Sequence, residues 1–162
     1  MVFMALSLRI LSVITSVSWA LAAVPVPADN GTRGQIEGDV ILMQGKWELV
    51  DFAYYTNDLV SRPPKEQRRG LRVVTGNKYH LTLQIGIQHV DADYSFKLFP
   101  NQKPKAFDVT MPDGRVVKGI YEVGARTLRR CYTQPDDPRP TRFQAGTQTY
   151  QVWKRVVERP AS

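Results

Sequence analysis

The stretch at residues 103–143 contains four short segments in succession that have the composition of β-strands or strand entries. They read KPKAFDVT (103–110), KGIYEV (118–123), TLRRCY (127–132) and RPTRF (139–143). β-Branched and aromatic residues are common in them, and Gly, Pro or Asp residues close each one, as expected for strands separated by turns. The Asp113-Gly114 pair between the first two segments is the strongest hairpin signal in the chain.

The same spacing continues on both sides of this stretch. Short strands in steps of about ten residues, with no long helical period, predict an antiparallel all-β domain. Residues 56–70 are polar and contain Pro63-Pro64, which predicts a long surface loop. The expected strands are residues 47–55, 71–75, 78–84, 86–91, 94–99, 106–111, 116–123, 127–133, 141–144 and 149–156.

Such a domain is either a sandwich or a barrel, and two details favour the barrel. Strands linked by hairpins close naturally into an up-and-down barrel, which removes exposed sheet edges. The two ends of the chain also match, because Gly45 and Trp47 open the first strand and Arg155 lies in the last. First and last strands pair in a closed barrel, so Arg155 can stack on the indole of Trp47. We predict a barrel of about eight to ten strands, with Gly45, Trp47 and Arg155 as the residues that close it structurally. A short helical turn at residues 39–45 is expected to precede the barrel.

The first 23 residues have the order of a secretory signal peptide. Arg9 precedes an apolar segment at residues 10–19, and Ala20-Leu21-Ala22 offers a cleavage pattern. An uncleaved membrane anchor is the alternative, but the apolar segment contains several hydroxyl residues and is shorter than the ~20 residues that span a bilayer. We expect export to the periplasm or the outside of the cell, with no stable membrane span after cleavage. The expected organisation is a signal peptide at 1–23, a flexible linker at 24–38, the barrel at 39–157 and a C-terminal tail at 158–162.

The bulk composition narrows the function classes. The net charge of +7 attracts the protein to acidic polymers. However, there is no long basic run and no aromatic-basic motif of a nucleic-acid-binding module, so specific nucleic-acid binding is not expected. Cys131 is the single cysteine, so no intrachain disulfide can form and stability must come from the core. The oligomeric state is not predicted.

Several motifs in order resemble an uncharacterised family of small exported domains, lipocalin-like in fold, that is abundant in planctomycete-type bacteria. The Gly-x-Trp at the first strand with a late Arg also resembles the signature of lipocalins and related calycin barrels. The family resemblance implies a lipocalin-like barrel and no assigned activity. The chain departs from the family pattern at Arg130, where an apolar residue is usual, and at Arg126, where an acidic one is usual. The matching pieces are MQGKW (43–47), KPKAFDVT (103–110), KGIYEV (118–123), Thr127-Leu128, Cys131-Tyr132, RPTRF (139–143) and Lys154-Arg155.

Catalytic and metal sites are weakly indicated, and none is predicted. Cys131 would need a nearby base to act as a nucleophile, and nothing in the sequence brings His80 or His89 close to it. These histidines with Asp91 and Asp93 fit no standard ligand spacing, and alternation along strands would split them between faces. No cofactor-binding motif is present, so no cofactor is expected.

The expected function is a non-enzymatic binding module that holds a small apolar or amphipathic ligand in the barrel. Asp108 lies in the middle of a strand, where carboxylates are disfavoured. It either faces solvent or points into a polar interior, with Arg130 or Arg142 as its partner. An ion pair that braces neighbouring strands is the structural alternative for Asp108. The alternative function is a cell-envelope interaction domain with a filled barrel, which binds an acidic polymer through a basic surface around residues 62–72. The candidate ligand-binding residues are Asp108, Tyr121, Tyr132, Arg139 and Arg142.

Overall fold

The computed structural model describes residues 30–56, 59–144 and 146–157. The expected signal peptide, the first part of the linker and the C-terminal tail lie outside these residues. Within them the chain forms an N-terminal helix, α1 (Asn30–Met43), one short 3₁₀ helix, η1 (Lys65–Gln67), and nine strands. The strands are β1 (Gly45–Thr56), β2 (Leu59–Ser61), β3 (Arg68–Thr75), β4 (Lys78–Ile85), β5 (Gln88–Phe99), β6 (Ala106–Thr110), β7 (Val116–Val123), β8 (Thr127–Tyr132) and β9 (Gln148–Arg155).

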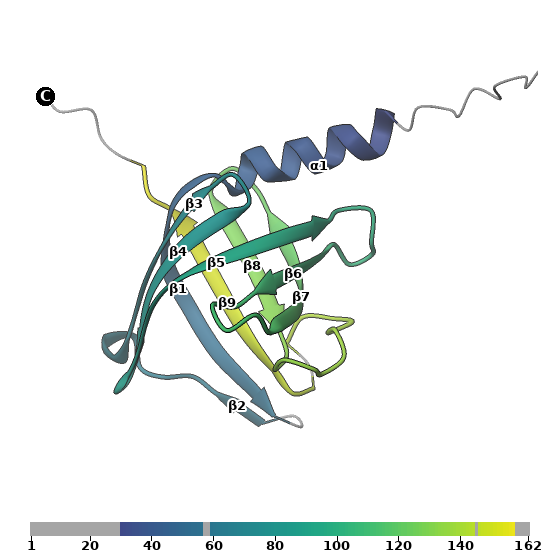
Figure 1. Ribbon diagram of the computed structural model, residues 1–162. Helices are drawn as coiled ribbons and strands as arrows, with labels where there is room; N and C mark the ends of the chain where they lie inside the picture. The colour runs from purple at the N-terminus through teal and green to yellow at the C-terminus, as the bar shows by residue number, and fades with distance from the viewer. Residues whose placement is uncertain (1–29, 57–58, 145, 158–162) are drawn as a thin grey trace, which may run out of the picture.

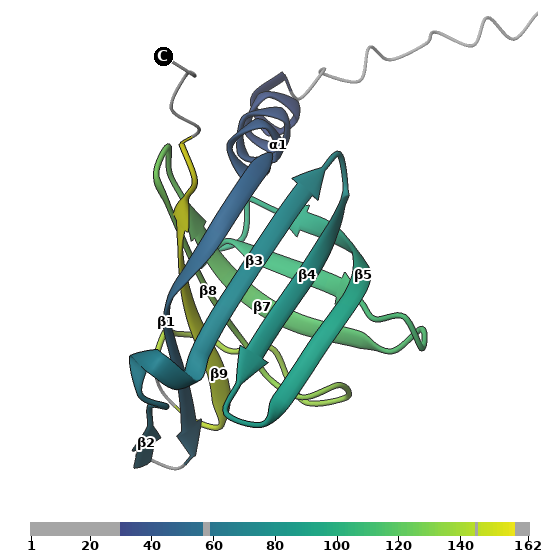
Figure 2. The same cartoon turned by 90° about the vertical axis from the view of Figure 1, so that its left-hand side faces the viewer.

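Eight of the strands form a closed antiparallel barrel. They follow one another in the order β1-β3-β4-β5-β6-β7-β8-β9, and β9 pairs again with β1 (Figure 1). β2 extends the sheet as a hairpin on the second half of β1. Figure 2 shows β3, β4 and β5 side by side as one wall of the barrel. The predicted all-β, up-and-down, lipocalin-like barrel is confirmed.

Helix α1 lies against one end of the barrel (Figures 1 and 2), and it is longer than predicted. It begins at Asn30, whereas we predicted a flexible linker to residue 38 and a short turn from Asp39. The prediction rested on three glycines, which lower helix propensity. The last turns are fixed by burial of Asp39 and Met43, and extending a fixed turn costs less than nucleating one.

Three other boundaries differ from the prediction. β5 is one strand of 12 residues and does not turn at Asp91–Asp93. The ladder to β4 continues because both carboxylates lie on the outer face, opposite Thr82 and His80. Residues 141–144 form turns and no strand, and Phe143 packs on a cluster outside the barrel. The predicted loop at residues 56–70 contains β2, η1 and the start of β3.

Alternation along the strands separates two apolar clusters. The large one fills the barrel and includes Trp47, Phe107, Tyr121 and Trp153. The small one lies on the outer face, where Ala53, Tyr55, Ile120, Cys131 and Tyr150 pack under Phe143 of the loop after β8. Cys131 therefore belongs to the outer packing, while its neighbours along β8 at positions 130 and 132 point inward.

Arg155 on the last strand ties β9 to the start of β1 and to the end of α1. Its guanidinium lies 4.2 Å from the centre of the Trp47 ring, and its Nε donates to the carbonyl of Ala125 at 2.6 Å. Its two other nitrogens donate to the carbonyls of Leu42 and Gln44 at the end of α1. Gly45 has a φ of +96°, which favours glycine, and a Cβ there would lie 3.2 Å from Arg155 Nη1 and would crowd the guanidinium.

We expect Arg155→Leu to destabilise the protein by about 2–4 kcal/mol, because three charge-assisted hydrogen bonds and a cation–π contact are lost together. Urea unfolding followed by tryptophan fluorescence measures this change. Arg115→Leu is the matched control, because Arg115 is exposed and its side chain bonds to Asp113 in its own turn. The control should change stability by no more than about 1 kcal/mol. Equal effects of the two substitutions would contradict the role given to Arg155.

Candidate functional site: a cationic interior

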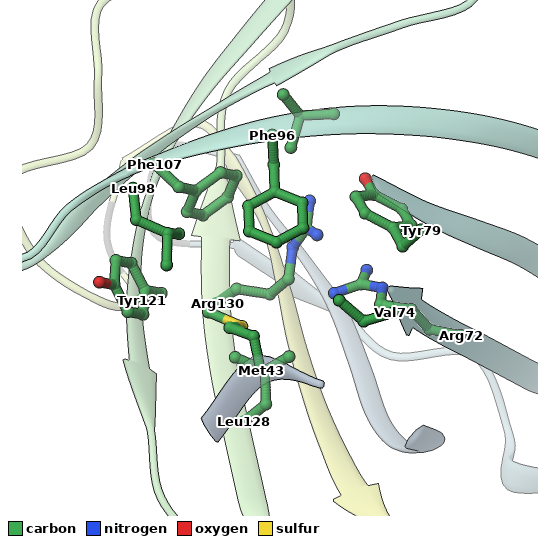
Figure 3. A pocket seen from close by; sticks show the side chains of 11 residues that line it. Met43, Arg72, Val74, Tyr79, Phe96, Leu98, Phe107, Tyr121, Leu128 and Arg130 are labelled. Carbon is green, nitrogen blue, oxygen red and sulfur yellow. The ribbon is translucent and has the colours of Figure 1, made fainter. Parts of the chain in front are cut away.

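A small cavity lies inside the barrel, close to α1. Its volume is about 20 Å³, which accommodates roughly one water molecule. Pockets for drug-sized ligands are much larger, at roughly 300–1,000 Å³, so the interior is nearly filled by side chains. Figure 3 shows that these side chains converge from α1 and from both walls of the barrel. The lining residues are Met43, Arg72, Val74, Tyr79, Phe96, Leu98, Phe107, Val109, Tyr121, Leu128 and Arg130.

Two of the lining residues are buried arginines. Arg72 on β3 is 3% exposed and Arg130 on β8 is 7% exposed. The Arg72 guanidinium lies 4.6 Å from the ring centre of Tyr79 and 4.3 Å from that of Trp153. Its Nη2 donates a long hydrogen bond of 3.5 Å to Gln151 Oε1. Aromatic rings therefore replace most of the water that this cation loses on folding.

The Arg130 guanidinium is held by rings alone. It lies 4.6 Å from the ring centre of Phe107 and 4.9 Å from that of Tyr132. Among the described residues it has no hydrogen-bond or ion-pair partner, and the Nε atoms of both arginines are buried without a partner.

The interior carries positive charge that the described part of the chain does not neutralise. Neither arginine pairs with a carboxylate there; the buried carboxylate of Asp39 bonds instead to Lys105 Nζ at 2.9 Å and to the hydroxyl of Tyr121 at 2.6 Å. Burial, and secondarily the like charge of Arg130, lower the pKa of Arg72 to about 9. Arg72 is thus still charged at neutral pH, but its charge is destabilised.

The five candidate ligand-binding residues do not come together. Tyr121 and Tyr132 face the interior, where Tyr132 accepts a hydrogen bond of 3.1 Å from Gln151 Nε2. Burial raises the pKa of both tyrosines, and for Tyr121 the hydrogen bond to Asp39 adds to the effect. Both hydroxyls are therefore protonated and neutral in the folded protein.

Asp108 and Arg139 lie on the outer face and form a brace. Arg139 Nη2 donates to Asp108 Oδ1 at 2.7 Å, and Nη1 donates to the carbonyls of Phe107 and Gly119 at 2.7 and 2.8 Å. Arg139 therefore joins β6, β7 and the loop after β8. The partners that we predicted for Asp108, Arg130 and Arg142, are wrong: Arg130 faces the interior, and it is Arg139 of that loop, not Arg142, that pairs with Asp108. The carbonyl of Arg142 accepts a weak hydrogen bond from Cys131 Sγ at 3.9 Å.

Sequence reasoning missed the arginine pair as a site. The signal was the phase of each strand: Arg72 alternates in step with Val74, and Arg130 alternates in step with Leu128 and Tyr132. An arginine in phase with core residues on two strands indicates a charged interior.

The chemistry considered for Cys131 and the histidines has no support in the structure. Burial raises the pKa of the Cys131 thiol to about 12, against the opposing charges of Arg130 and Arg129. His80 lies between Asp91 and Asp93 on one outer face, with distances of 3.1 and 2.9 Å, so the expectation that alternation would separate them is wrong. Across residues 30–56, 59–144 and 146–157, no group of three or more His, Cys, Asp or Glu side chains is arranged to hold a metal ion.

Comparisons with known proteins add little. No protein-family model matches the chain, and no curated protein matches it. Among solved structures, a protein described as a "secretary abundant heat soluble (SAHS) protein" from Ramazzottius varieornatus matches with 15% sequence identity and a TM-score of 0.37, covering 71% of this chain and 96% of that one. So loose a likeness says nothing about function. Within the part of the chain that the structure describes, no helix is long and apolar enough to cross a membrane.

We expect Cys131 to be unreactive in the folded protein. A thiol with a pKa of about 12 that is fully buried has almost no thiolate at pH 8. Ellman's reagent should label it only after unfolding in guanidinium chloride. Stoichiometric labelling of the folded protein within minutes would contradict this and would reopen the case for a reactive cysteine.

Proposed function

We propose that the protein is a non-enzymatic binding module that holds a small amphipathic molecule inside its barrel. The observation that carries the proposal is the lining of the cavity. Apolar side chains surround most of it, while two buried arginines face it with hydrogen-bonding groups that the described residues leave largely unused. A mostly apolar wall with a few convergent polar groups is the usual composition of small-molecule sites.

The ligand enters by displacing side chains, because the free volume is only about 20 Å³. Met43 is unbranched and adapts readily to a new shape. Phe96 is only partly buried. It lies on β5, whose register with β6 runs only from Ser95 to Phe99. Phe96 itself is paired with Val109, but the part of β5 that precedes Ser95 lacks this neighbour. We place the opening of the barrel wall in that segment, next to Phe96.

The expected signal peptide supports an extracytoplasmic setting for this binding, because cleavage before the barrel would release it after export. Such a module would take up its ligand in the cell envelope or outside the cell.

A second candidate function is binding of an acidic polymer on the outside of the barrel. A groove of about 870 Å³ runs beside β1, β3 and η1, and its lining includes Lys65, Arg68, Arg69 and Lys154. Glu48 and Glu66 also line it, and Arg68 is engaged by Asp51, so its net positive charge is modest. Binding there would weaken steeply with salt.

We expect the purified protein to be stabilised by an eight-carbon amphiphile. The panel for a thermal-unfolding screen is octanoate, octan-1-ol and octylamine, with heparin as a polyanion. A ligand at one hundred times its dissociation constant adds about 2.7 kcal/mol. Val74→Leu should weaken the response by adding a methylene to the cavity wall, and Val117→Leu is the matched control because Val117 is buried in the same core but does not line the cavity.

Stabilisation by an amphiphile that Val74→Leu weakens and Val117→Leu does not would support binding in the interior. A response to heparin alone, lost in salt, would favour the outer groove. If no amphiphile stabilises the protein, the interior-binding proposal is wrong.

A further inference from the structure

We infer that the polar head of the ligand is a carboxylate, bound between Arg72 and Arg130 with its apolar part directed towards α1. This inference rests on the proposed function and narrows its ligand class. It follows from the charge, the free donors and the size of the cavity.

The first argument is the missing counter-charge. Buried cations in proteins are normally paired, because an isolated charge loses far more hydration than it regains from neutral surroundings. Here two guanidiniums line one small cavity and repel each other. Within the described residues the buried carboxylate of Asp39 cannot compensate them, because Lys105 and Tyr121 occupy it. An anion in the cavity would relieve both desolvation and repulsion.

The second argument is the arrangement of donors. Rings contact both guanidiniums at 4.3–4.9 Å, and such contacts use the π face of the ring but consume no N–H donor in the plane of the cation. Among the described residues, Arg72 has one long hydrogen bond and Arg130 has none. Both guanidiniums lie near the ring of Tyr79, at 4.6 Å (Arg72) and 6.0 Å (Arg130) from its centre, and in the view of Figure 3 they lie beside the space between Tyr79 and Phe96. Paired N–H groups of this kind match the two oxygens of a carboxylate.

The third argument is size and surroundings. A space of about 20 Å³ suits a small planar head better than a tetrahedral phosphate or sulfate. The rest of the lining is mostly apolar and includes Met43 of α1 with Val74, Leu98 and Leu128. The hydroxyl of Tyr121, which also lines the cavity, is already bonded to Asp39 of α1. An aliphatic chain would be buried there, which contributes about 0.8 kcal/mol for each CH₂ group. The site therefore fits an aliphatic monocarboxylate.

Isothermal titration calorimetry of the protein with octanoate, octan-1-ol and octylamine at pH 7 tests the inference. The three probes share one chain and differ in the charge of the head. Octanoate should bind at least tenfold more tightly than octan-1-ol, and octylamine should bind most weakly. Equal affinity for octanoate and octan-1-ol would overturn the inference and leave the proposed function standing. Absence of binding by all three would overturn both.

The Arg130→Leu substitution tests whether the preference for octanoate over octan-1-ol arises in the interior of the barrel. It should lower the affinity for octanoate at least tenfold while changing that for octan-1-ol less than threefold. Arg130→Lys keeps the positive charge but loses the paired N–H donors of the guanidinium, so it should retain part of the preference for octanoate. Arg115→Leu removes the same charge from an exposed turn and should change neither affinity. If Arg115→Leu weakens octanoate binding as much as Arg130→Leu, the preference comes from overall charge and the inference is wrong.

The ligand-free stability of Arg130→Leu separates a binding residue from a packing residue. Replacing a buried unpaired charge by leucine should raise the melting temperature. Arg72→Met serves as a second variant if Arg130→Leu does not fold, and the same loss of octanoate preference is expected of it. A marked fall in the melting temperature of both variants, with the preference for octanoate kept, would assign the arginines to packing and contradict the inference.

Discussion

The pairing of β1 with β9 is the constraint on which the rest of the structure depends, because it turns a strip of hairpins into a closed barrel. Arg155 reinforces it from the last strand. Its guanidinium covers Trp47 and donates to carbonyls of α1 and of the β7–β8 turn. The same residue therefore closes the sheet and holds the helix at the end of the barrel, where Met43 becomes part of the cavity wall.

Closure creates an interior in which charge is costly, and two arginines are placed there. Packing alone does not account for them, since leucine or phenylalanine would fill the same space without losing hydration. The aromatic rings around Arg72 and Arg130 lower the cost but supply no negative charge. The nearly filled interior and the unmatched charge are compatible if the ligand is small at its head and displaces adaptable side chains with its tail. The unmatched charge is therefore our reason to prefer a barrel that binds a ligand in its interior to one that serves only as a scaffold.

The sequence predicted the barrel because turn residues and alternation are local signals. The Asp113-Gly114 hairpin and the match between Trp47 and Arg155 needed no knowledge of distant contacts. The helix at Asn30–Met43 was shortened in the prediction because its stability comes from tertiary burial of Asp39, which overrides three glycines. The site was harder to predict. Asp108 attracted attention as a charge within a strand, but its partner Arg139 comes from a loop whose path depends on an outer apolar cluster. To predict the arginine pair, one has to know which face of β3 and which face of β8 point into the barrel.

The most direct test of the central claim observes the two guanidiniums themselves. In a two-dimensional ¹H–¹⁵N spectrum of the arginine Nε–H groups, the signals of Arg72 and Arg130 can be assigned by substitution and followed as ligand is added. The account predicts that octanoate shifts both signals at the same ligand concentration, while octan-1-ol leaves them nearly in place. Shifts confined to arginines on the outside of the barrel would contradict it, because the anion would then bind the surface and not the interior.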